Sequence, residues 1–410
     1  MFLESVAAMG GVQFSTLYLA RALDRSRWNP IVVCPTAGDL THACRDANVE
    51  TRVIFYPRMW STSIRIARSA RVPNVFAWLW NALVLVKSTH LIKRYLREVG
   101  PEVLVTKGLA SHFIGGLAAR WLGTACVWHV QDLISDRSFG LYRRIFAFAA
   151  RRLPDRIIVD GAAIKRQLPP ATHSHTSVVH NGVDTNIFRP DKDGSAARRE
   201  LGISPDQLVI GHAARVTPWK GQHYLIEAFA EFASQHANVV LLFTGSPVFD
   251  HDGYEQRLRS MAADLGLEER IKFAGYRHDL PNVLAAMDIF AFTSIEKDTT
   301  PLALLSAMSS GLPIVAFDIE GVREICGDEK SFPVIPVGDS KALAQSLSSL
   351  IGNQALRVRL GENARRLAEQ KFSLERYVSN MELALTNSSQ FQFEAPVVSA
   401  ESSAVSAISS

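Results

Sequence analysis

The sequence is poor in cysteine, and its four cysteines form no recognisable pattern. Cys34, Cys44, Cys126 and Cys326 are far apart, and each lies in or beside an apolar run. This spacing excludes a disulfide-rich scaffold and a cysteine zinc site, because both need closely spaced cysteines. We therefore expect four buried thiols in a reducing cytoplasm.

The sequence also has little net charge and no long apolar run. Its 44 Lys and Arg against 40 Asp and Glu give a charge of +4, which argues against nucleic-acid binding unless the positive residues cluster on one face. The first residues lack the order of a signal peptide, and no apolar stretch reaches the roughly 18 residues of a membrane span. We therefore expect no segment that crosses a bilayer.

The length and the apolar pattern predict two α/β domains. The chain has 410 residues, 47% of them hydrophobic, and a domain has about 150 residues. Continuous apolar runs alternate with helical segments, which indicates parallel sheets covered by helices on both faces. The predicted strands are 31–33, 53–55, 103–105, 125–128 and 156–159 in the first half, and 208–210, 239–243, 271–273, 289–292 and 313–316 in the second.

The domain boundaries follow from a polar connection at 189–194 and from the composition of the two ends. The opening strand is short for an α/β domain, so we hypothesise that the true start lies several residues upstream. The Ser/Ala-rich end has few large apolar residues and is typical of a disordered tail. The predicted units are a first domain at 1–188, a second domain at 189–371, a helix at 372–386 and a tail at 387–410.

Two cations follow the first strand of the second half. Arg215 and Lys220 lie between this strand and a helix predicted to begin near Tyr224. Arginine can bind two phosphate oxygens at once, lysine neutralises charge, and ligands bind at this edge of such sheets. The pattern favours a diphosphate site, although the spacing alone also fits a solvated pair of cations.

A second anion-binding segment is predicted about eighty residues later. Thr300 before Pro301 is typical of a helix N-cap and first turn, so the following helix should offer free N–H groups. The alternative is an ordinary capped core helix. That alternative explains Leu302, Leu305 and Met308 but leaves the polar run at 293–300 unexplained.

With these elements in order, the chain resembles glycosyltransferase family 4 from about residue 10 to residue 385. That family contains retaining enzymes of the GT-B fold, which use nucleotide-sugar donors. The resemblance implies two Rossmann-like, doubly wound parallel-sheet domains facing a cleft, with a C-terminal helix returning to the first domain. The matching residues are Gly10, Gly11, His180 to Asp184, Phe188, Pro190, Arg215, Lys220, Thr244, Gly245, 273–276, Asp279, Asp288, Ser294, Ala307, Met308, Gly311, Pro313, Gly321 and Glu324.

The resemblance assigns a donor site. Arg215 and Lys220 would hold the diphosphate, and the backbone around Tyr276 would meet the base. Glycines before the first helix would let the loop approach the donor closely. The implied donor-binding residues are Gly10, Gly11, Arg215, Lys220, Gly245, Tyr276, Asp298, Thr299, Thr300, Leu302 and Ser306.

Two positions depart from the family's paired acids. Asp298 takes the place of the first acidic residue, one methylene shorter than the usual glutamate. Ser306 replaces the second acid, which holds the ribose in relatives, and losing that hydrogen bond costs about 1–2 kcal/mol. This register excludes Glu296, which would pair with the apolar Leu304.

A third departure lies in the first half. Gln131 stands where relatives often keep a histidine near the donor sugar, while His129 lies two residues earlier on the same strand face. His129 is either a substitute ligand for the sugar hydroxyls or a structural histidine. The resemblance therefore makes His129 a candidate catalytic residue beside Asp298, Arg215 and Lys220.

The implied activity is retaining transfer of a hexose from a UDP- or GDP-linked donor, with no metal cofactor. The implied acceptor is a saccharide, linked to a lipid such as polyprenyl phosphate, in surface polysaccharide or glycolipid synthesis. The departures keep alternatives open: a degenerate, non-catalytic partner subunit, or a GT-B epimerase or nucleotide-sugar hydrolase.

Basic and aromatic residues gather at 58–97 and 142–152. Arginines and lysines interleave there with tryptophan and phenylalanine, as at an anionic membrane surface. We expect a cytoplasmic protein that associates peripherally with the inner face of the membrane. The alternative is helices that pack on the sheet with solvated arginines. Nucleic acid is a poorer candidate, because no known binding module accompanies the cluster.

Overall fold

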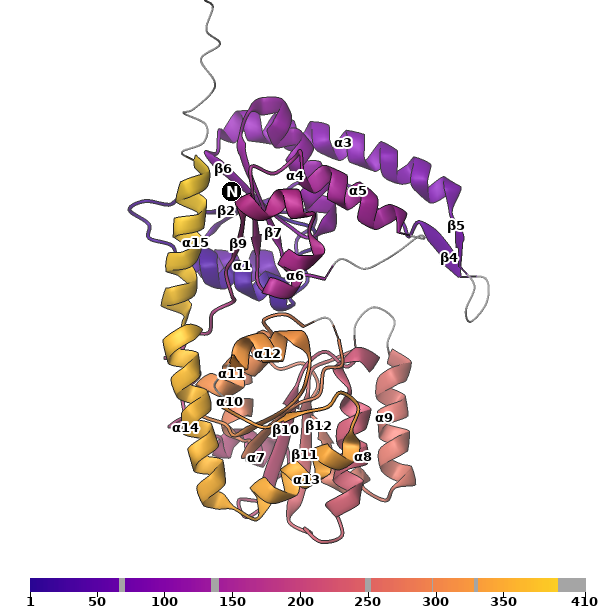
Figure 1. Cartoon of the computed structure of the whole chain (residues 1–410), viewed down its shortest axis with the longest axis vertical. Helices are drawn as coiled ribbons and strands as arrows, with labels where there is room; N and C mark the ends of the chain where they lie inside the picture. Colours follow the sequence, from indigo (N-terminus) through magenta and orange to yellow (C-terminus); the bar gives the residue numbers. More distant parts are fainter. Residues whose placement is uncertain (66–70, 134–139, 248–251, 297, 328–330, 390–410) are drawn as a thin grey trace, which may run out of the picture.

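The computed structural model describes residues 1–65, 71–133, 140–247, 252–296, 298–327 and 331–389. Within these residues the chain forms two α/β domains, each built on a parallel sheet with helices on both faces (Figure 1). The fold is therefore the predicted GT-B arrangement of two Rossmann-like domains.

The first domain holds a parallel sheet in the order β3-β2-β1-β6-β7-β8-β9. Its inner strands are continuous apolar runs, because helices cover both faces. In the described chain its strands are β1 Phe2–Glu4, β2 Ile31–Cys34, β3 Glu50–Val53, β6 Val103–Lys107, β7 Ala125–Val130, β8 Arg156–Val159 and β9 Thr176–Val178, and its helices are α1 Gly11–Ala22, α2 Asp39–Asp46, α3 Val75–Val99, α4 Leu109–Leu122, α5 Leu141–Ala150 and α6 Ala162–Gln167.

The second domain holds a parallel sheet in the order β12-β11-β10-β13-β14-β15. In both sheets the strand order reverses next to the first strand of the domain, which creates a switch point where ligands bind in such folds. The described strands are β10 Leu208–Ala213, β11 Val239–Thr244, β12 Ile271–Phe273, β13 Ile289–Phe292, β14 Ile314–Phe317 and β15 Val334–Ile335, and the helices are α7 Ser195–Glu200, α8 Gln222–Phe232, α9 Asp252–Asp264, α10 Leu280–Ala285, α11 Leu302–Ser309, α12 Glu320–Cys326, α13 Ser340–Ile351 and α14 Gln354–Lys371.

A last helix, α15 (Leu374–Ser389), returns to the first domain (Figure 1). The chain crosses over at Val183, whose N–H donates to Phe372 O at 2.8 Å and whose carbonyl accepts from Leu374 N at 2.9 Å. Tyr377 and Met381 then pack into the first-domain core. The helix continues three residues past the predicted end at 386, and residues 390–410 of the predicted tail lie outside the described residues.

Nine of the ten predicted strands coincide with observed strands, and the segment predicted at 53–55 was wrong. The observed strand, β3, ends at Val53, and Phe55 is exposed. β3 is an edge strand with polar, exposed residues, so apolar content did not mark it. The sequence analysis also missed β9, β15 and an antiparallel hairpin of β4 (Ser63–Arg65) and β5 (Arg71–Pro73), which are all two or three residues long.

The prediction of four buried thiols is confirmed, and the prediction of no span-length apolar segment was wrong. All four cysteines are buried and free. In the described part of the chain, one helix, α3, is long and apolar enough to cross a membrane, judged by its length and composition. Lys87 interrupts the apolar run, but the mean hydropathy of the helix around it stays high. By itself, one such helix is weak evidence for a span.

Candidate functional site

The predicted donor residues lie at the switch point of the second sheet. β10 and β13 are neighbouring parallel strands, with Ile210 paired to Ile289, so their carboxyl ends meet at one edge. The loop after β10 carries Arg215 and Lys220, and the loop after β13 carries Asp298. The topology therefore brings together three residues that are up to 83 positions apart in the sequence.

Lys220 and Asp298 form a buried ion pair at this edge. The Lys220 Nζ lies 2.6 Å from Oδ1 and 2.5 Å from Oδ2 of Asp298, and the two side chains are 9% and 16% exposed. The hydroxyl of Thr293 donates to the Lys220 carbonyl at 2.9 Å and fixes that backbone. An anion that binds Lys220 must therefore share its ammonium group with Asp298.

Arg215 is exposed at the same edge and faces an acid of the first domain. Burial raises the pKa of Asp132, the positive charge of Arg215 lowers it, and the negative charge of Asp298 raises it. Asp132 therefore lies close enough to both residues to feel their charges. The sequence analysis did not select Asp132, although it directly follows the Gln131 position.

Glycine is required where the strand ends approach each other. A Cβ on Gly245 would lie 1.9 Å from the Ala214 carbonyl oxygen, and the φ of Gly245 is +132°. Its N–H donates to Gly275 O at 2.8 Å, which joins the loop before Tyr276 to the loop after β11. Tyr276 is 43% exposed. Partial burial is the main cause that raises its pKa, and the negative charge of Asp39, in the first domain, raises this pKa further.

Thr299 and Thr300 contact the first domain. The Thr299 hydroxyl donates to Asp160 Oδ1 at 2.7 Å, the Thr300 hydroxyl donates to the Asp160 carbonyl, and Asn181 Nδ2 donates to Thr300 O at 3.0 Å. The predicted N-cap role of Thr300 was wrong. The N-cap of α11 is Pro301, with no side-chain capping bond, because the Thr300 hydroxyl is used across the domain boundary.

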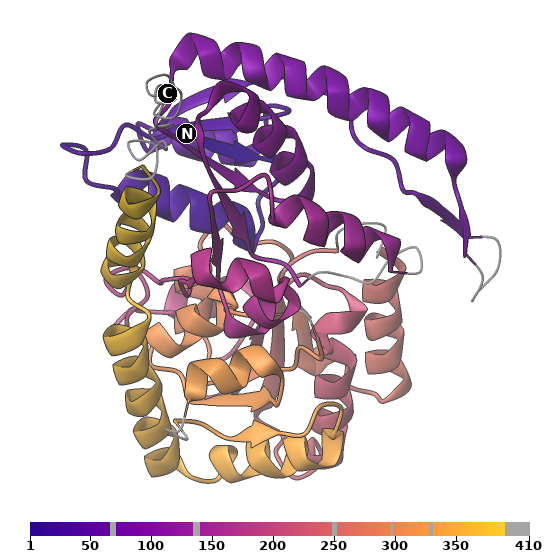
Figure 2. The same cartoon turned by 45° about the horizontal axis from the view of Figure 1, so that its top comes forward.

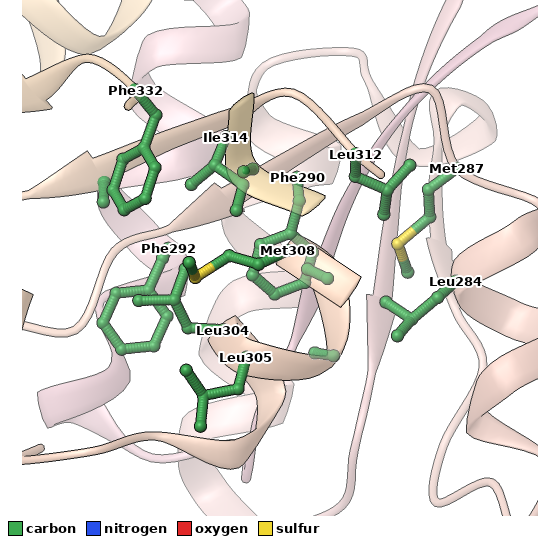
Figure 3. Packing of buried hydrophobic residues seen from close by; sticks show 14 of the residues in the cluster. Leu284, Met287, Phe290, Phe292, Leu304, Leu305, Met308, Leu312, Ile314 and Phe332 are labelled. Carbon is green, nitrogen blue, oxygen red and sulfur yellow. The ribbon is translucent and has the colours of Figure 1, made fainter. Parts of the chain in front are cut away.

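Helix α11 packs its apolar residues into the core of the second domain. Leu304, Leu305 and Met308 are fully buried against β13 and β14 (Figure 3). Leu304 is thus a core residue, and the choice of Asp298 over Glu296 stays a prediction. Ser306 is also buried, at 4% exposure, and its proposed contact with a ribose stays a prediction.

Polar side chains connect the interior of the first domain to the second domain. Lys107 Nζ donates to Ser15 Oγ at 2.7 Å, and Ser15 Oγ donates to Gln131 Oε1 at 3.2 Å. The Nε2 of Gln131 then donates to Asn181 Oδ1 at 3.2 Å. Asn181 Nδ2 donates in turn to Asp160 at 3.2 Å. Gln131 is therefore a link in this network, which ends at Thr299.

His129 lies inside the first domain, beside Lys107 and His112. It is almost fully buried, and neither ring nitrogen has a hydrogen-bond partner among the described residues. Burial lowers its pKa well below the ordinary value, and both neighbours lower it further, so the ring is neutral. The structure leaves both predicted roles of His129 open.

The paired glycines lie at the N-terminus of α1. Gly10 is the N-cap and Gly11 the first helical residue. A Cβ on Gly11 would meet no heavy atom within 4 Å, whereas a Cβ on Gly10 would lie 3.1 Å from Gln13 Oε1. The space around Gly11 is open, and the close approach of a donor to this loop stays a prediction.

Two further acids at the domain boundary were missed as site residues. Asp160 directly follows β8, a predicted strand, so its place at a carboxyl edge was readable from the sequence. Glu324 accepts from Ala162 N at 2.8 Å and pairs with His180 Nε2 at 2.7 Å, joining α12 to the first domain. Among the described residues, no group of three or more His, Cys, Asp or Glu could hold a metal ion.

Asp160 should make stability depend on pH. Burial raises its pKa to about 8, so the folded protein holds a proton that the unfolded chain, with a pKa near 3.9, has released. This stabilisation is complete below the unfolded pKa and is lost as pH rises through the folded pKa. We expect the free energy of unfolding of wild type, relative to Asp160→Asn, to fall by roughly 1–3 kcal/mol from pH 5 to pH 8. Urea unfolding at several pH values measures this, and parallel pH profiles would contradict it.

Comparison with known proteins identifies the family. A model described as "Glycosyltransferase Family 4" matches residues 9–187, and one described as "Glycosyl transferases group 1" matches residues 193–367. The chain belongs to the family 4 and group 1 glycosyltransferases. The two matches cover both domains of this family member and confirm the resemblance predicted from the sequence.

One similar relative spans both domains of this family member. It is the UDP-Gal:alpha-D-GlcNAc-diphosphoundecaprenol alpha-1,3-galactosyltransferase of Escherichia coli, which is 23% identical and matches over 91% of this chain and 92% of its own length. Spore coat protein SA of Bacillus subtilis is 27% identical over 52% of this chain and 59% of its own. The D-inositol 3-phosphate glycosyltransferase of Corynebacterium efficiens is 28% identical over 52% of this chain and 54% of its own. The match thus spans just over half the length of the latter two proteins.

Solved structures show the same fold. Anabaena HepE in complex with UDP-glucose superposes with a TM-score of 0.80 at 23% identity, covering 94% of this chain and 98% of that one. WaaG, a glycosyltransferase involved in lipopolysaccharide biosynthesis, superposes with a TM-score of 0.66 at 17% identity and 94% coverage of this chain. At these identities the likeness supports the fold alone.

Proposed function

We propose that the protein is a retaining glycosyltransferase that moves a hexose from a nucleotide-diphosphate sugar to a lipid-linked saccharide. The observation that carries this proposal is the cluster of Arg215, Lys220 and Asp298 at the switch-point edge, facing Asp132 of the other domain. Cations there suit a diphosphate, and carboxylates suit sugar hydroxyls.

In the proposed reaction, the bond between the sugar C1 and the diphosphate oxygen breaks, and a bond from C1 to the acceptor oxygen forms on the same face. The leaving diphosphate takes the proton of the acceptor hydroxyl. Arg215 and Lys220 stabilise the negative charge that develops on the diphosphate, in a partly buried site where that interaction is strong. We propose that these cations fill this role without a metal ion.

The acceptor proposal is supported by relatives. The E. coli relative carries a diphosphoundecaprenol acceptor in its name, and the Rhizobium meliloti relative LpsB is named as a lipopolysaccharide core mannosyltransferase. The solved HepE structure contains UDP-glucose, which favours a UDP-linked donor. A lipid-linked acceptor would place the protein at the cytoplasmic face of a membrane.

The proposal is tested by turnover. The purified full chain is incubated with UDP-, GDP- and ADP-hexoses, with and without a polyprenyl-diphosphate-linked saccharide. We expect nucleotide release that requires the acceptor, and a product that keeps the donor's anomeric configuration by NMR. Release without any acceptor would instead support a hydrolase, and release with none of the donors would favour a degenerate partner subunit.

The ribose contact gives a separate prediction. Ser306→Glu restores the longer, charged acceptor that relatives use, so donor affinity should rise by about 5- to 30-fold, equivalent to about 1–2 kcal/mol. Titration calorimetry with UDP measures the change, and Ser306→Gln, which has nearly the same length as glutamate but no charge, is the matched control. An unchanged affinity in Ser306→Glu would overturn the register or the ribose role.

A further inference from the structure

Helix α3 is an outlying element of the first domain. Its 25 residues correspond to about 37 Å at 1.5 Å per residue. In both views it runs out past α4, with the β4–β5 hairpin at its far end (Figures 1 and 2). Ala77 and Val84 are buried in its first half, the other buried residues, Ser88, Thr89, Ile92 and Leu96, lie in its second half, and α3 packs mainly against α4. The first half therefore projects from the domain.

The exposed face of the first half is apolar. Its residues recur at helical spacing, so they form one stripe. Each is between 58% and 80% exposed, although large apolar side chains on a soluble surface are usually scattered. The stripe consists of Val75, Phe76, Leu79, Leu83 and Val86.

The same face becomes cationic in the second half. Lys87, His90, Arg94 and Arg97 are exposed along the continuation of the stripe. The one acidic residue of α3 is Glu98, in its last turn. The exposed face thus changes from apolar to cationic about 18 Å along the helix.

Aromatic side chains are held in place beside the apolar stripe. Trp60 stacks on Trp80 with ring centroids 5.0 Å apart, and Asn81 bonds both the Trp60 N–H, at 2.7 Å, and its carbonyl, at 2.9 Å. Trp60 is half-exposed despite this fixation. Indole rings with one apolar and one polar side suit a membrane interface.

Helix α5 extends toward the same side of the domain as α3 in both views (Figures 1 and 2). Leu141, Ile145 and Phe148 are exposed on it, and the Arg152 guanidinium lies 4.0 Å from the Phe148 ring centroid. Exposed apolar side chains and arginine thus recur together on this second helix. Of the basic segment predicted at 58–97, residues 66–70 lie outside the described residues.

We propose that the exposed face of α3 binds an anionic bilayer, with its apolar first half entering the interface and its cationic second half lying against the head groups. This proposal deepens the proposed function, on which it rests for a lipid-linked acceptor. A membrane span does not fit, because α3 packs against α4 through its second half. A second copy of the chain would present the same cation-rich helix, whereas an anionic surface complements its charge.

The test is sedimentation of the full chain with vesicles of phosphatidylcholine, with and without phosphatidylglycerol. We expect binding to the anionic vesicles, at least about 10-fold weaker binding for Leu79→Glu with Leu83→Glu, and weaker binding for Arg94→Gln with Arg97→Gln. The matched control is Val358→Glu with Leu383→Glu, which changes two residues of similar exposure on α14 and α15. Circular dichroism confirms that each variant folds.

Wild-type binding by Leu79→Glu with Leu83→Glu would overturn the proposal, and so would equal binding to both vesicle types. If light scattering shows that the wild type is a dimer and that this double variant is a monomer, a second copy of the chain occupies the α3 face instead of a membrane. Donor binding separates the two proposals. The α3 variant should keep its thermal shift with UDP, and Arg215→Ala with Lys220→Ala should keep its vesicle binding.

Discussion

Replacing Arg215 and Lys220 together by alanine is expected to lower kcat/KM for the donor by at least about 10³-fold, because removing a single charge-stabilising group typically costs 10²–10³. Both cations lie at the carboxyl edge of β10, and Lys220 is held in place by Asp298 and Thr293. The substitution also leaves the Asp298 carboxylate without its partner Lys220, and an unpaired carboxylate repels a diphosphate. Steady-state kinetics with the active donor, together with calorimetry, measure both losses.

The matched control is Lys341→Ala with Arg366→Ala. These two exposed cations lie on α13 and α14 of the same domain, so the variant has the same net charge without changing the edge of the sheet. It should keep wild-type kinetics. Unchanged donor affinity in the Arg215 and Lys220 variant, with intact folding by circular dichroism, would show that the diphosphate binds elsewhere.

Gly221→Ala is expected to destabilise the protein by about 3 kcal/mol, combining a left-handed backbone with overpacking. Gly221 has φ +67°, and a Cβ there would lie 2.1 Å from the carbonyl oxygen of Thr293. That oxygen is backbone next to β13, so relief of the clash must push the β10 and β13 loops apart. We therefore expect weaker donor binding as well, because Lys220 and Asp298 lie on those two loops.

Gly266→Ala separates the two contributions. Gly266 has nearly the same φ, +65°, but a Cβ there would meet no heavy atom within 4 Å. This variant should lose only about 1 kcal/mol and keep its donor affinity, since the left-handed backbone is the only strain. Urea unfolding of both variants gives the comparison. Equal losses would mean that the contact with Thr293 relaxes freely.

The buried strands were readable from the sequence because burial on both faces demands continuous apolar residues. Segments 125–128 and 289–292 lie within β7 and β13 for this reason. The strands that were predicted wrongly or missed are edge strands or the short strands of a hairpin. Each of them pairs with one neighbouring strand, so fewer contacts constrain its sequence. Helix α3 shows the same limit, because its apolar stripe faces outward, and no local pattern tells an outward stripe from a core stripe.

The site divides in the same way. Arg215 and Lys220 were selected from the residues themselves, since a diphosphate needs cations near strand ends. Asp298 was selected through the resemblance to the family, whose motif spacing set the register. Asp160, Asp132 and Glu324 were missed or given no role, because their partners in the other domain lie 83 or more positions away. Sequence spacing carries no signal for such a pair.

The sequence by itself determined the two parallel-sheet domains, the family and the two cations that follow β10. Each depends on local patterns: apolar runs, glycine turns and short motifs. The tertiary structure alone decided that Lys220 pairs with Asp298, that Thr300 bonds to the first domain instead of capping α11, and that α3 points its apolar face outward. These outcomes depend on which surfaces meet when the domains pack, and packing is a property of the whole chain.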